Sequence, residues 1–174
     1  WYLRRSRDRF KDGGVAQKEA MATLRSVLLD LSKVMAPFTP FFAEHIYAEI
    51  GGVLESVHLE SWPQIHTVEA KILGDMEHVR TISSRGLEAR MSQKINVRQP
   101  LSVLKVKNPI VKTLTPSLIE IIKDEVNVKE VASDETLTTD VWLDATITPE
   151  LKQEGDLREL LRKIQDARKE KNLT

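Results

Sequence analysis

The sequence predicts a mainly helical α+β fold, in which a helical bundle over residues 1–98 is followed by a small α+β module over residues 99–174. In the first part, apolar residues such as Leu24, Val27 and Leu31 recur at the three-and-four spacing of a helix that packs on a core. In the second part the apolar spacing changes to period two and β-branched residues become frequent. This change of period is the main evidence for two domains.

The helices of the first part are bounded by residues that interrupt helices. Gly13-Gly14 and Gly51-Gly52 provide flexible breaks, and Pro37 lacks the backbone donor that a helix interior requires. Thr39 stands in the capping position before a proline in the first turn. The predicted helices span Trp1 to about Asp12, Val15–Met35, Thr39–Ile50 and Val68–Ser92, with Glu55–Pro63 as an ordered loop and Gly86 as a point of bending.

Each predicted helix of the first part has an apolar stripe that we expect to be buried. The stripes consist of Ala20, Leu24, Val27, Leu28, Leu31, Val34 and Met35 in the second helix, Phe42, Ile46 and Ile50 in the third, and Ile72, Met76, Val79 and Ile82 in the fourth.

The second part is predicted to contain three strands and two helices. The strands are Leu101–Lys107, Asn127–Ala132 and Asp140–Ile147, and the short helix is Thr115–Asp124. A final helix begins at Thr148-Pro149-Glu150, because a cap residue, a proline and an acid suit the first turn. We expect it to bury Leu151, Leu157, Leu161 and Ile164 and to end with Asn172 as a left-handed cap.

Composition restricts the function without identifying it. The 174 residues carry 26 basic and 26 acidic side chains and no cysteine, so disulfides and thiolate zinc sites are excluded and a reducing, cytoplasmic setting is expected. No apolar run has the length of a membrane span, and no secretory signal opens the sequence. The sequence has no phosphate-binding loop, no GxGxxG, no GxSxG and no paired metal-ligating histidines, so we expect no catalytic residue, metal or cofactor in this chain.

Two segments are strongly basic although the net charge is zero. Trp1–Lys11 holds five basic residues and one acid, and so does Arg80–Arg98. Such stripes are suited to binding RNA phosphates, and guanidinium groups also form bidentate contacts with base edges. A solvated helix face would have the same spacing, so both interpretations stay open at this point. The candidate RNA-binding residues are Arg4, Arg7, Lys11, Arg85, Arg90, Lys94 and Arg98.

Five segments together form a distinctive set of motifs. They are Trp1–Phe10, Met35–Tyr47 (MAPFTPFFAEHIY), Glu55–Pro63 (ESVHLESWP), Gly86–Arg90 with Ile95–Leu101 (GLEAR and INVRQPL), and Leu151–Lys169. They resemble the anticodon-binding region of isoleucyl-tRNA synthetases, of the archaeal and eukaryotic-like type, occur in the order found in that family, and cover nearly the whole chain. Two positions depart from the family pattern: Asp156 stands where an apolar residue is usual, and Asn172 stands where glycine is usual.

The resemblance implies a class I ligase that uses ATP and Mg²⁺ to attach isoleucine to its tRNA. Its HIGH and KMSKS signatures and its editing domain would lie upstream of this chain. The string RMSQK at residues 90–94 has the outline of a KMSKS loop, but no nucleotide-binding α/β domain precedes it here, so we assign the match to chance. In related synthetases an arginine of the first anticodon-domain helix reads the anticodon, and by position Arg7 matches it best, with Arg4 nearby.

The sequence therefore predicts a non-catalytic module that binds the anticodon stem-loop of tRNA and contacts the upstream catalytic domain of its parent ligase. Neither DNA nor a membrane is expected as a partner. The alternative is a protein-interaction module that docks on a synthetase or on its own catalytic domain. A self-sufficient small enzyme is disfavoured, because no nucleophile, metal site or phosphate loop is present.

Overall fold

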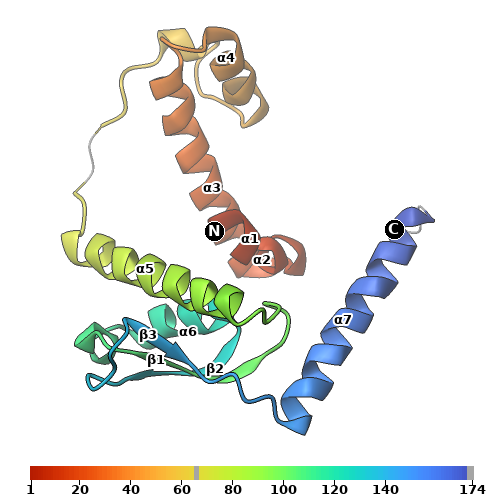
Figure 1. The fold of residues 1–174 in the computed structure, drawn as a ribbon. Coiled ribbons are helices and arrows are strands. Elements are labelled where there is room, and N and C mark those ends of the chain that lie inside the picture. The colour runs from red at the N-terminus through yellow and green to blue at the C-terminus, as the bar shows by residue number, and fades with distance from the viewer. Residues whose placement is uncertain (65–66, 172–174) are drawn as a thin grey trace. The chain divides into compact units, whose positions relative to one another are not determined.

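A computed structural model describes residues 1–64 and 67–171, and it confirms the predicted mainly helical α+β fold (Figure 1). By packing, the chain divides into two compact units, Trp1–Thr67 and Val68–Thr174. The predicted cap Asn172 lies outside the described residues.

The first unit is helical throughout its regular structure. It contains α1 (Tyr2–Arg5), α2 (Arg7–Asp12), α3 (Gly14–Met35), α4 (Pro40–Glu49) and a 3₁₀ turn, η1 (Val57–Leu59). The predicted first helix is interrupted at Ser6, which is buried, although the Ser6 N–H still donates to the Tyr2 carbonyl and the Ser6 carbonyl accepts from the Phe10 N–H. Gly13 and Gly14 both have positive φ, 76° and 72°, which lets the chain reverse between α2 and α3.

The core of the first unit is small, and α4 faces it differently from the prediction. Ala43 and Tyr47 are buried against Ala36 and Val57, whereas the predicted core residue Phe42 is 56% exposed. The Tyr47 ring fills the space beside Gly52, where an added Cβ would lie 2.0 Å from Tyr47 Cε1. The face of α4 that carries Ala43 and Tyr47 is therefore the buried one, and apolar spacing alone did not reveal this.

The predicted stripe of α3 is also only partly buried. Ala20 is fully enclosed and Leu24, Leu28 and Met35 are half-buried. Val27, Leu31 and Val34 are exposed, and on these three the prediction of a buried stripe is wrong.

A polar network closes this core. The Tyr47 hydroxyl donates to Glu60 Oε1 at 2.5 Å and accepts from the Leu54 N–H at 2.8 Å, and Lys33 Nζ lies 3.0 Å from Glu60 Oε2. The hydrogen bond from Tyr47 and then the contact with Lys33 hold the pKa of the Glu60 carboxyl below its usual value of 4.5. When the pKa of a carboxyl is lower in the folded chain than in the unfolded chain, the carboxyl stabilises the fold at any pH above its unfolded pKa. This contribution disappears as the pH falls through the folded pKa.

We therefore expect the first unit to lose stability on acidification below about pH 4.5, and Glu60→Gln to be less stable at neutral pH but less sensitive to acid. Urea unfolding from pH 7 to pH 3 measures this, with Glu55→Gln as a control at an exposed carboxylate. Equal acid sensitivity in wild type and Glu60→Gln would contradict the assignment of this effect to Glu60.

The second unit is built on a three-stranded sheet. Its elements are α5 (Ala70–Ser92), β1 (Leu101–Val106), η2 (Pro109–Lys112), α6 (Pro116–Val126), β2 (Val128–Ser133), β3 (Val141–Leu143) and α7 (Pro149–Glu170). The strand order is β2-β1-β3: β1 pairs parallel with β2, after the α6 crossover, and antiparallel with β3. Leu101 is aligned with Val128, and Leu104 with Leu143.

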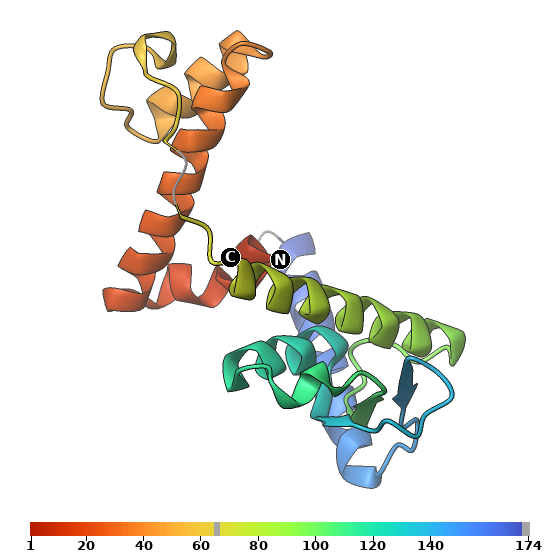
Figure 2. The same ribbon diagram turned by 90° about the vertical axis from the view of Figure 1, so that its left-hand side faces the viewer.

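Helix α5 packs with this sheet and with α6 (Figure 2). Val79 and Ile82 of α5 are buried in one core with residues of β1 and α6. Helix α5 continues through Gly86 without interruption, and a Cβ at this position would lie 2.8 Å from Val126 Cγ2, so glycine allows close packing. The division by packing therefore falls at residues 67/68 and not at residue 98, because the apolar face of α5 is buried by the α+β elements.

Among the described residues, helix α7 contacts the rest of its unit through its N-terminal half. The Thr148 hydroxyl accepts from the Leu151 N–H at 3.3 Å, which confirms the predicted cap. Leu151 is buried, and Gly155 lies so close to Gln99 that a Cβ would meet Gln99 Oε1 at 2.5 Å. From Leu160 to Glu170 every residue is exposed, so the prediction that Leu157, Leu161 and Ile164 are buried is wrong.

Candidate nucleic-acid interface

The basic segment α1–α2 is held against α3 by side chains at both of its ends. The Tyr2 hydroxyl donates to the Ala20 carbonyl at 3.1 Å, and Gln17 Nε2 donates to the Phe10 carbonyl at 2.6 Å. An exposed ion pair joins Arg9 to Glu19 at 3.7 Å. These contacts fix the side of α1–α2 that faces α3.

Arg7 and Lys11 occupy one side of α2, four residues apart, and both are exposed. Neither forms an ion pair or a side-chain hydrogen bond within the part of the chain that the structure describes. Two exposed and unneutralised cations on one helix face are well placed to receive phosphates. Arg4 is also exposed, but it lies on α1, beyond the interruption at Ser6.

Arg90 does not belong to a binding surface, and the prediction that it contacts RNA is corrected here. Its side chain is 1% exposed, and its guanidinium donates to four backbone carbonyls. The acceptors are Val126 (2.6 Å), Asn127 (2.7 Å), Gln99 (2.9 Å) and Asn96 (3.0 Å). Burial lowers the pKa of Arg90 to about 10, so the group remains charged at neutral pH. Arg90 ties α5 to the loop after it and to the end of α6.

The loop that Arg90 holds carries two further predicted residues. Lys94 is exposed, has a left-handed backbone (φ 58°), and has no side-chain partner among the described residues. Arg98 is 43% exposed in its side chain and lies 3.7 Å from Glu159 of α7. The carbonyls of Asn96 and Gln99 accept from Arg90, so the buried arginine positions the exposed cations of the same loop.

Arg85 is exposed but its charge is compensated. It lies 3.0 Å from Glu88 and 3.6 Å from Asp140. An incoming phosphate would have to compete with both carboxylates, so Arg85 is a weaker candidate than Lys94.

Three cations that lie beside Arg98 were not among the predicted RNA-binding residues. A cavity of about 470 Å³ is lined by Arg98 together with Lys123, Lys129 and Arg158. These three are already paired: Lys123 with Glu120 at 2.7 Å, and both Lys129 and Arg158 with Glu154 at 2.5 and 2.7 Å. No local sequence signal distinguishes them, because the chain brings them together only through the fold.

The described residues contain no cluster of three or more histidine or acidic side chains that could hold a metal ion. In the same part of the chain, none of the helices combines the length and the hydropathy of a membrane span.

Comparison with known proteins places this chain in a family. Residues 1–107 match the family model described as the anticodon-binding domain of tRNA ligase. The isoleucine–tRNA ligase of Deinococcus radiodurans is 36% identical over 141 residues, covering 75% of this chain and 13% of that protein. That of Chlamydia trachomatis is 41% identical over 140 residues, again 75% of this chain and 13% of the relative. That of Dehalococcoides mccartyi is 34% identical over 194 aligned positions, covering 97% of this chain and 19% of the relative.

The chain thus spans less than a fifth of the length of these curated relatives. The family match begins at residue 1 and includes Arg7, Lys11, Lys94 and Arg98, the exposed cations described above. It ends at residue 107, close to the predicted domain boundary and well beyond the division by packing. The chain therefore belongs to the family of anticodon-binding domains of tRNA ligases, and the relatives that it resembles are isoleucine–tRNA ligases.

Proposed function

We propose that this chain binds the anticodon stem-loop of an isoleucine tRNA, with α2 as the principal contact. The observation that carries the proposal is the pair of exposed, unneutralised cations Arg7 and Lys11 on one face of α2, within the segment that matches the anticodon-binding family. A lysine binds a phosphate as a point charge, whereas an arginine can also read a base edge with two parallel hydrogen bonds. Arg7 is therefore the residue to which we assign recognition of a base.

The other predicted cations have unequal roles in this proposal. Lys94 and Arg98 contribute phosphate contacts from the loop that Arg90 holds, and Arg4 contributes one from α1. Arg85 contributes little, because Glu88 and Asp140 already neutralise it.

The chemistry of ligation is assigned to other parts of a longer chain. The relatives are isoleucine–tRNA ligases of which this chain covers about an eighth to a fifth. We infer that the parent protein is a cytoplasmic ligase that uses ATP and Mg²⁺ in an upstream catalytic domain. In this proposal the present chain supplies affinity and positioning, and it contains neither catalytic residues nor a cofactor site.

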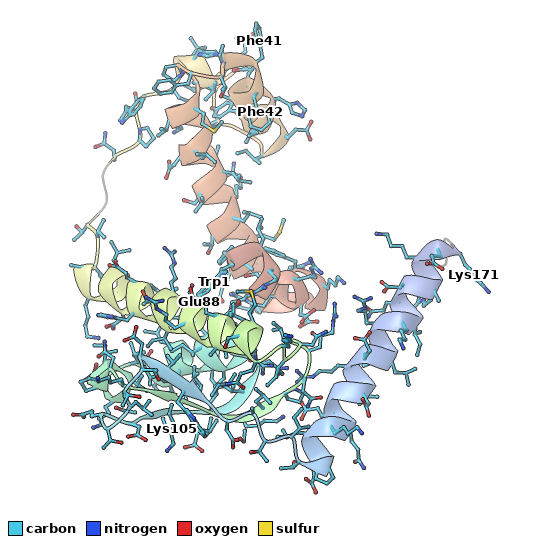
Figure 3. The ribbon with its side chains drawn as sticks, in the orientation of Figure 1. Trp1, Phe41, Phe42, Glu88, Lys105 and Lys171 are labelled. Atoms are coloured by element: carbon cyan, nitrogen blue, oxygen red, sulfur yellow. The ribbon has the colours of Figure 1, made fainter. Side chains whose placement is uncertain are left out.

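The alternative, a protein-interaction module, is supported by the exposed aromatic side chains of the first unit. Phe38 is 79% and Phe41 is 90% exposed, and Figure 3 shows Phe41 and Phe42 projecting from α4. Exposed apolar patches of this kind are typical of docking sites. Retention of a catalytic-domain partner by Arg7→Ala plus Lys11→Ala, together with its loss in Phe38→Ser plus Phe41→Ser, would favour this alternative.

Salt dependence tests the phosphate contacts. Five contacts, from Arg4, Arg7, Lys11, Lys94 and Arg98, predict that log K for a tRNA anticodon stem-loop falls against log salt with a slope of roughly −3.5 to −4.5. Replacing both Arg7 and Lys11 with alanine should weaken binding at least about tenfold and reduce the magnitude of the slope by roughly 1.4 to 1.8. Fluorescence titrations at several salt concentrations measure both quantities.

The matched control removes two charges that are already paired, in Arg85→Ala plus Lys112→Ala. This variant should bind nearly as wild type does. A slope near zero for the wild-type chain, or an equal loss in the two double variants, would contradict the proposed phosphate contacts.

A further inference from the structure

The loop between α5 and β1 is held by side chains from other segments of the second unit. The Asn96 and Gln99 carbonyls accept from the buried Arg90 guanidinium at 3.0 and 2.9 Å. Between them, the Val97 carbonyl accepts from Asn127 Nδ2 at 2.8 Å. Asn127 thus holds the part of the loop that lies between the two carbonyls bound by Arg90.

Asn127 has the backbone conformation in which glycine usually ends a helix. It is the C-cap of α6, its φ is 55°, and its N–H donates to the Lys123 carbonyl. Glycine is the commonest residue at such a position, because it has no Cβ to clash with the backbone. Asparagine also tolerates the left-handed conformation, and it brings an amide side chain. Since the cap needs only the backbone, the amide can serve another role.

Partners on both sides fix the orientation of the Asn127 amide. Arg158 Nη1 of α7 donates to Asn127 Oδ1 at 2.6 Å. A guanidinium only donates hydrogen bonds and a carbonyl only accepts them, so the amide oxygen faces Arg158 and the amide nitrogen faces Val97. Arg158 is itself held by Glu154 at 2.7 Å. One side chain, that of Asn127, therefore links α7 to the loop.

The loop has little regular structure of its own. Residues 93–100 form turns but no helix or strand, and most of them are exposed. Within the loop, the Arg98 N–H donates to Asn96 Oδ1 at 3.0 Å. The Arg98 guanidinium stays accessible to a phosphate, because its ion pair with Glu159 is long, at 3.7 Å, and exposed. The position of the cations in this loop therefore depends on contacts from outside it.

We propose that Asn127 is a positioning residue for the RNA contacts of Lys94 and Arg98. This inference rests on the proposed function, in which both cations bind phosphates. By holding the Val97 carbonyl, Asn127 limits the motion of the loop before RNA binds, so less conformational freedom is lost on binding. A loop released from Asn127 would keep both cations, but their contacts with phosphates would form at a greater entropic cost.

Asn127→Gly separates the role of the amide from that of the backbone cap. Glycine keeps the left-handed conformation and the N–H that caps α6, and it removes both hydrogen bonds of the amide. The matched control is Asn108→Gly, beyond the opposite end of β1. It also removes an asparagine side chain that binds the backbone, in this case the Ile110 N–H at 2.9 Å. Circular dichroism should show that both variants keep their helical content.

Spin-label mobility tests whether Asn127 holds the loop, without any RNA. The chain has no native cysteine, so Val97→Cys accepts a single nitroxide label at a side chain that is 45% exposed. The label should become more mobile in Asn127→Gly and should keep its wild-type mobility in Asn108→Gly. Unchanged mobility in Asn127→Gly would overturn the proposal.

Titration with the isoleucine-tRNA anticodon stem-loop tests whether the held loop matters for binding. Asn127→Gly should weaken binding about two- to tenfold, the factor that corresponds to ordering one side chain at an interface. Asn108→Gly should bind as wild type does. In a chain that already carries Lys94→Ala and Arg98→Ala, Asn127→Gly should have no further effect, because it acts through those two cations. An equal loss in that background, or an equal loss in Asn108→Gly, would overturn the proposal.

The same titrations separate a failure of the positioning role from a failure of the proposed function. If Lys94→Ala plus Arg98→Ala binds the stem-loop as wild type does, the phosphate contacts assigned to the loop are wrong, and the positioning role is wrong with them. If that double variant binds more weakly while Asn127→Gly binds as wild type does, the phosphate contacts stand and only the role of Asn127 is wrong.

Discussion

Replacing Arg90 with alanine is expected to destabilise the second unit by about 3–5 kcal/mol, the cost typical of a buried cavity combined with the loss of hydrogen bonds from a charged donor. Arg90 is 1% exposed, and its guanidinium is the common donor to four carbonyls from two segments of the chain, the loop after α5 and the end of α6. Alanine would leave a cavity and would remove the hydrogen bond that the Arg90 side chain donates to the Val126 carbonyl. A buried carbonyl that has no hydrogen-bond donor lowers the stability of the folded state.

The measurement is urea denaturation followed by Trp142 fluorescence, in a background where Trp1 and Trp62 are phenylalanine. Trp142 lies in β3, beside Lys105 and within the second unit, so it reports on that unit alone. Arg90→Lys should be destabilised as well, because one ammonium cannot replace the planar fork of donors. Arg80→Ala, an exposed arginine of the same helix, should change stability by less than about 0.5 kcal/mol, as is usual for surface substitutions. An equal effect of Arg80→Ala and Arg90→Ala would refute the structural role of Arg90.

Most elements of the fold could be predicted because their signals are local. Thr148 caps α7 as predicted, and Gly13-Gly14 and Pro37 separate helices where their backbone restrictions require it. The change of apolar period near Pro100 correctly marked the start of β1. Only the third predicted strand was much too long, since β3 spans Val141–Leu143. The residue pattern on which the prediction rested continues beyond Leu143, the last residue of β3 that pairs with β1. Pairing ends there because it depends on the neighbouring strand.

Packing partners could not be predicted, because amphipathic spacing shows which face of a helix is apolar but not what covers it. Helix α5 has the stripe of a bundle helix, yet Val79 and Ile82 pack with the sheet. In α4 the buried face carries Ala43 and Tyr47, whose hydroxyl is hydrogen-bonded, and Phe42 is exposed. Along α7, Ile164 has the spacing of a core residue and no cover within the second unit.

The candidate site shows the same division between local and non-local signals. Arg85, Arg90 and Lys94 are alike by spacing and charge, but their environments differ completely. Arg90 is buried because carbonyls 36 and 37 residues away, at Val126 and Asn127, converge on it. Nothing local in the sequence indicates that convergence. The exposure of Arg7 and Lys11 agrees with the prediction, and their contact with RNA stays a prediction.

Arg7→Ala is expected to remove the preference of this chain for its own anticodon. A bidentate arginine–base contact is worth about 1–3 kcal/mol of discrimination, so the affinity ratio between matched and mismatched loops should fall from at least about fivefold to near one. Arg7→Lys should retain most of the overall affinity, because it keeps the positive charge, and should still lose the preference. Lys11→Ala should weaken binding to both loops equally, because a phosphate contact carries no sequence information.

The measurement that tests the account most directly is a titration of the chain with the isoleucine-tRNA anticodon stem-loop and with the same stem-loop carrying a changed anticodon, at one salt concentration. The account predicts tighter binding to the isoleucine loop in wild type and in Lys11→Ala, and equal binding to the two loops in Arg7→Ala. Equal binding of the two loops by the wild-type chain, or a preference that persists in Arg7→Ala, would contradict the assignment of anticodon recognition to α2.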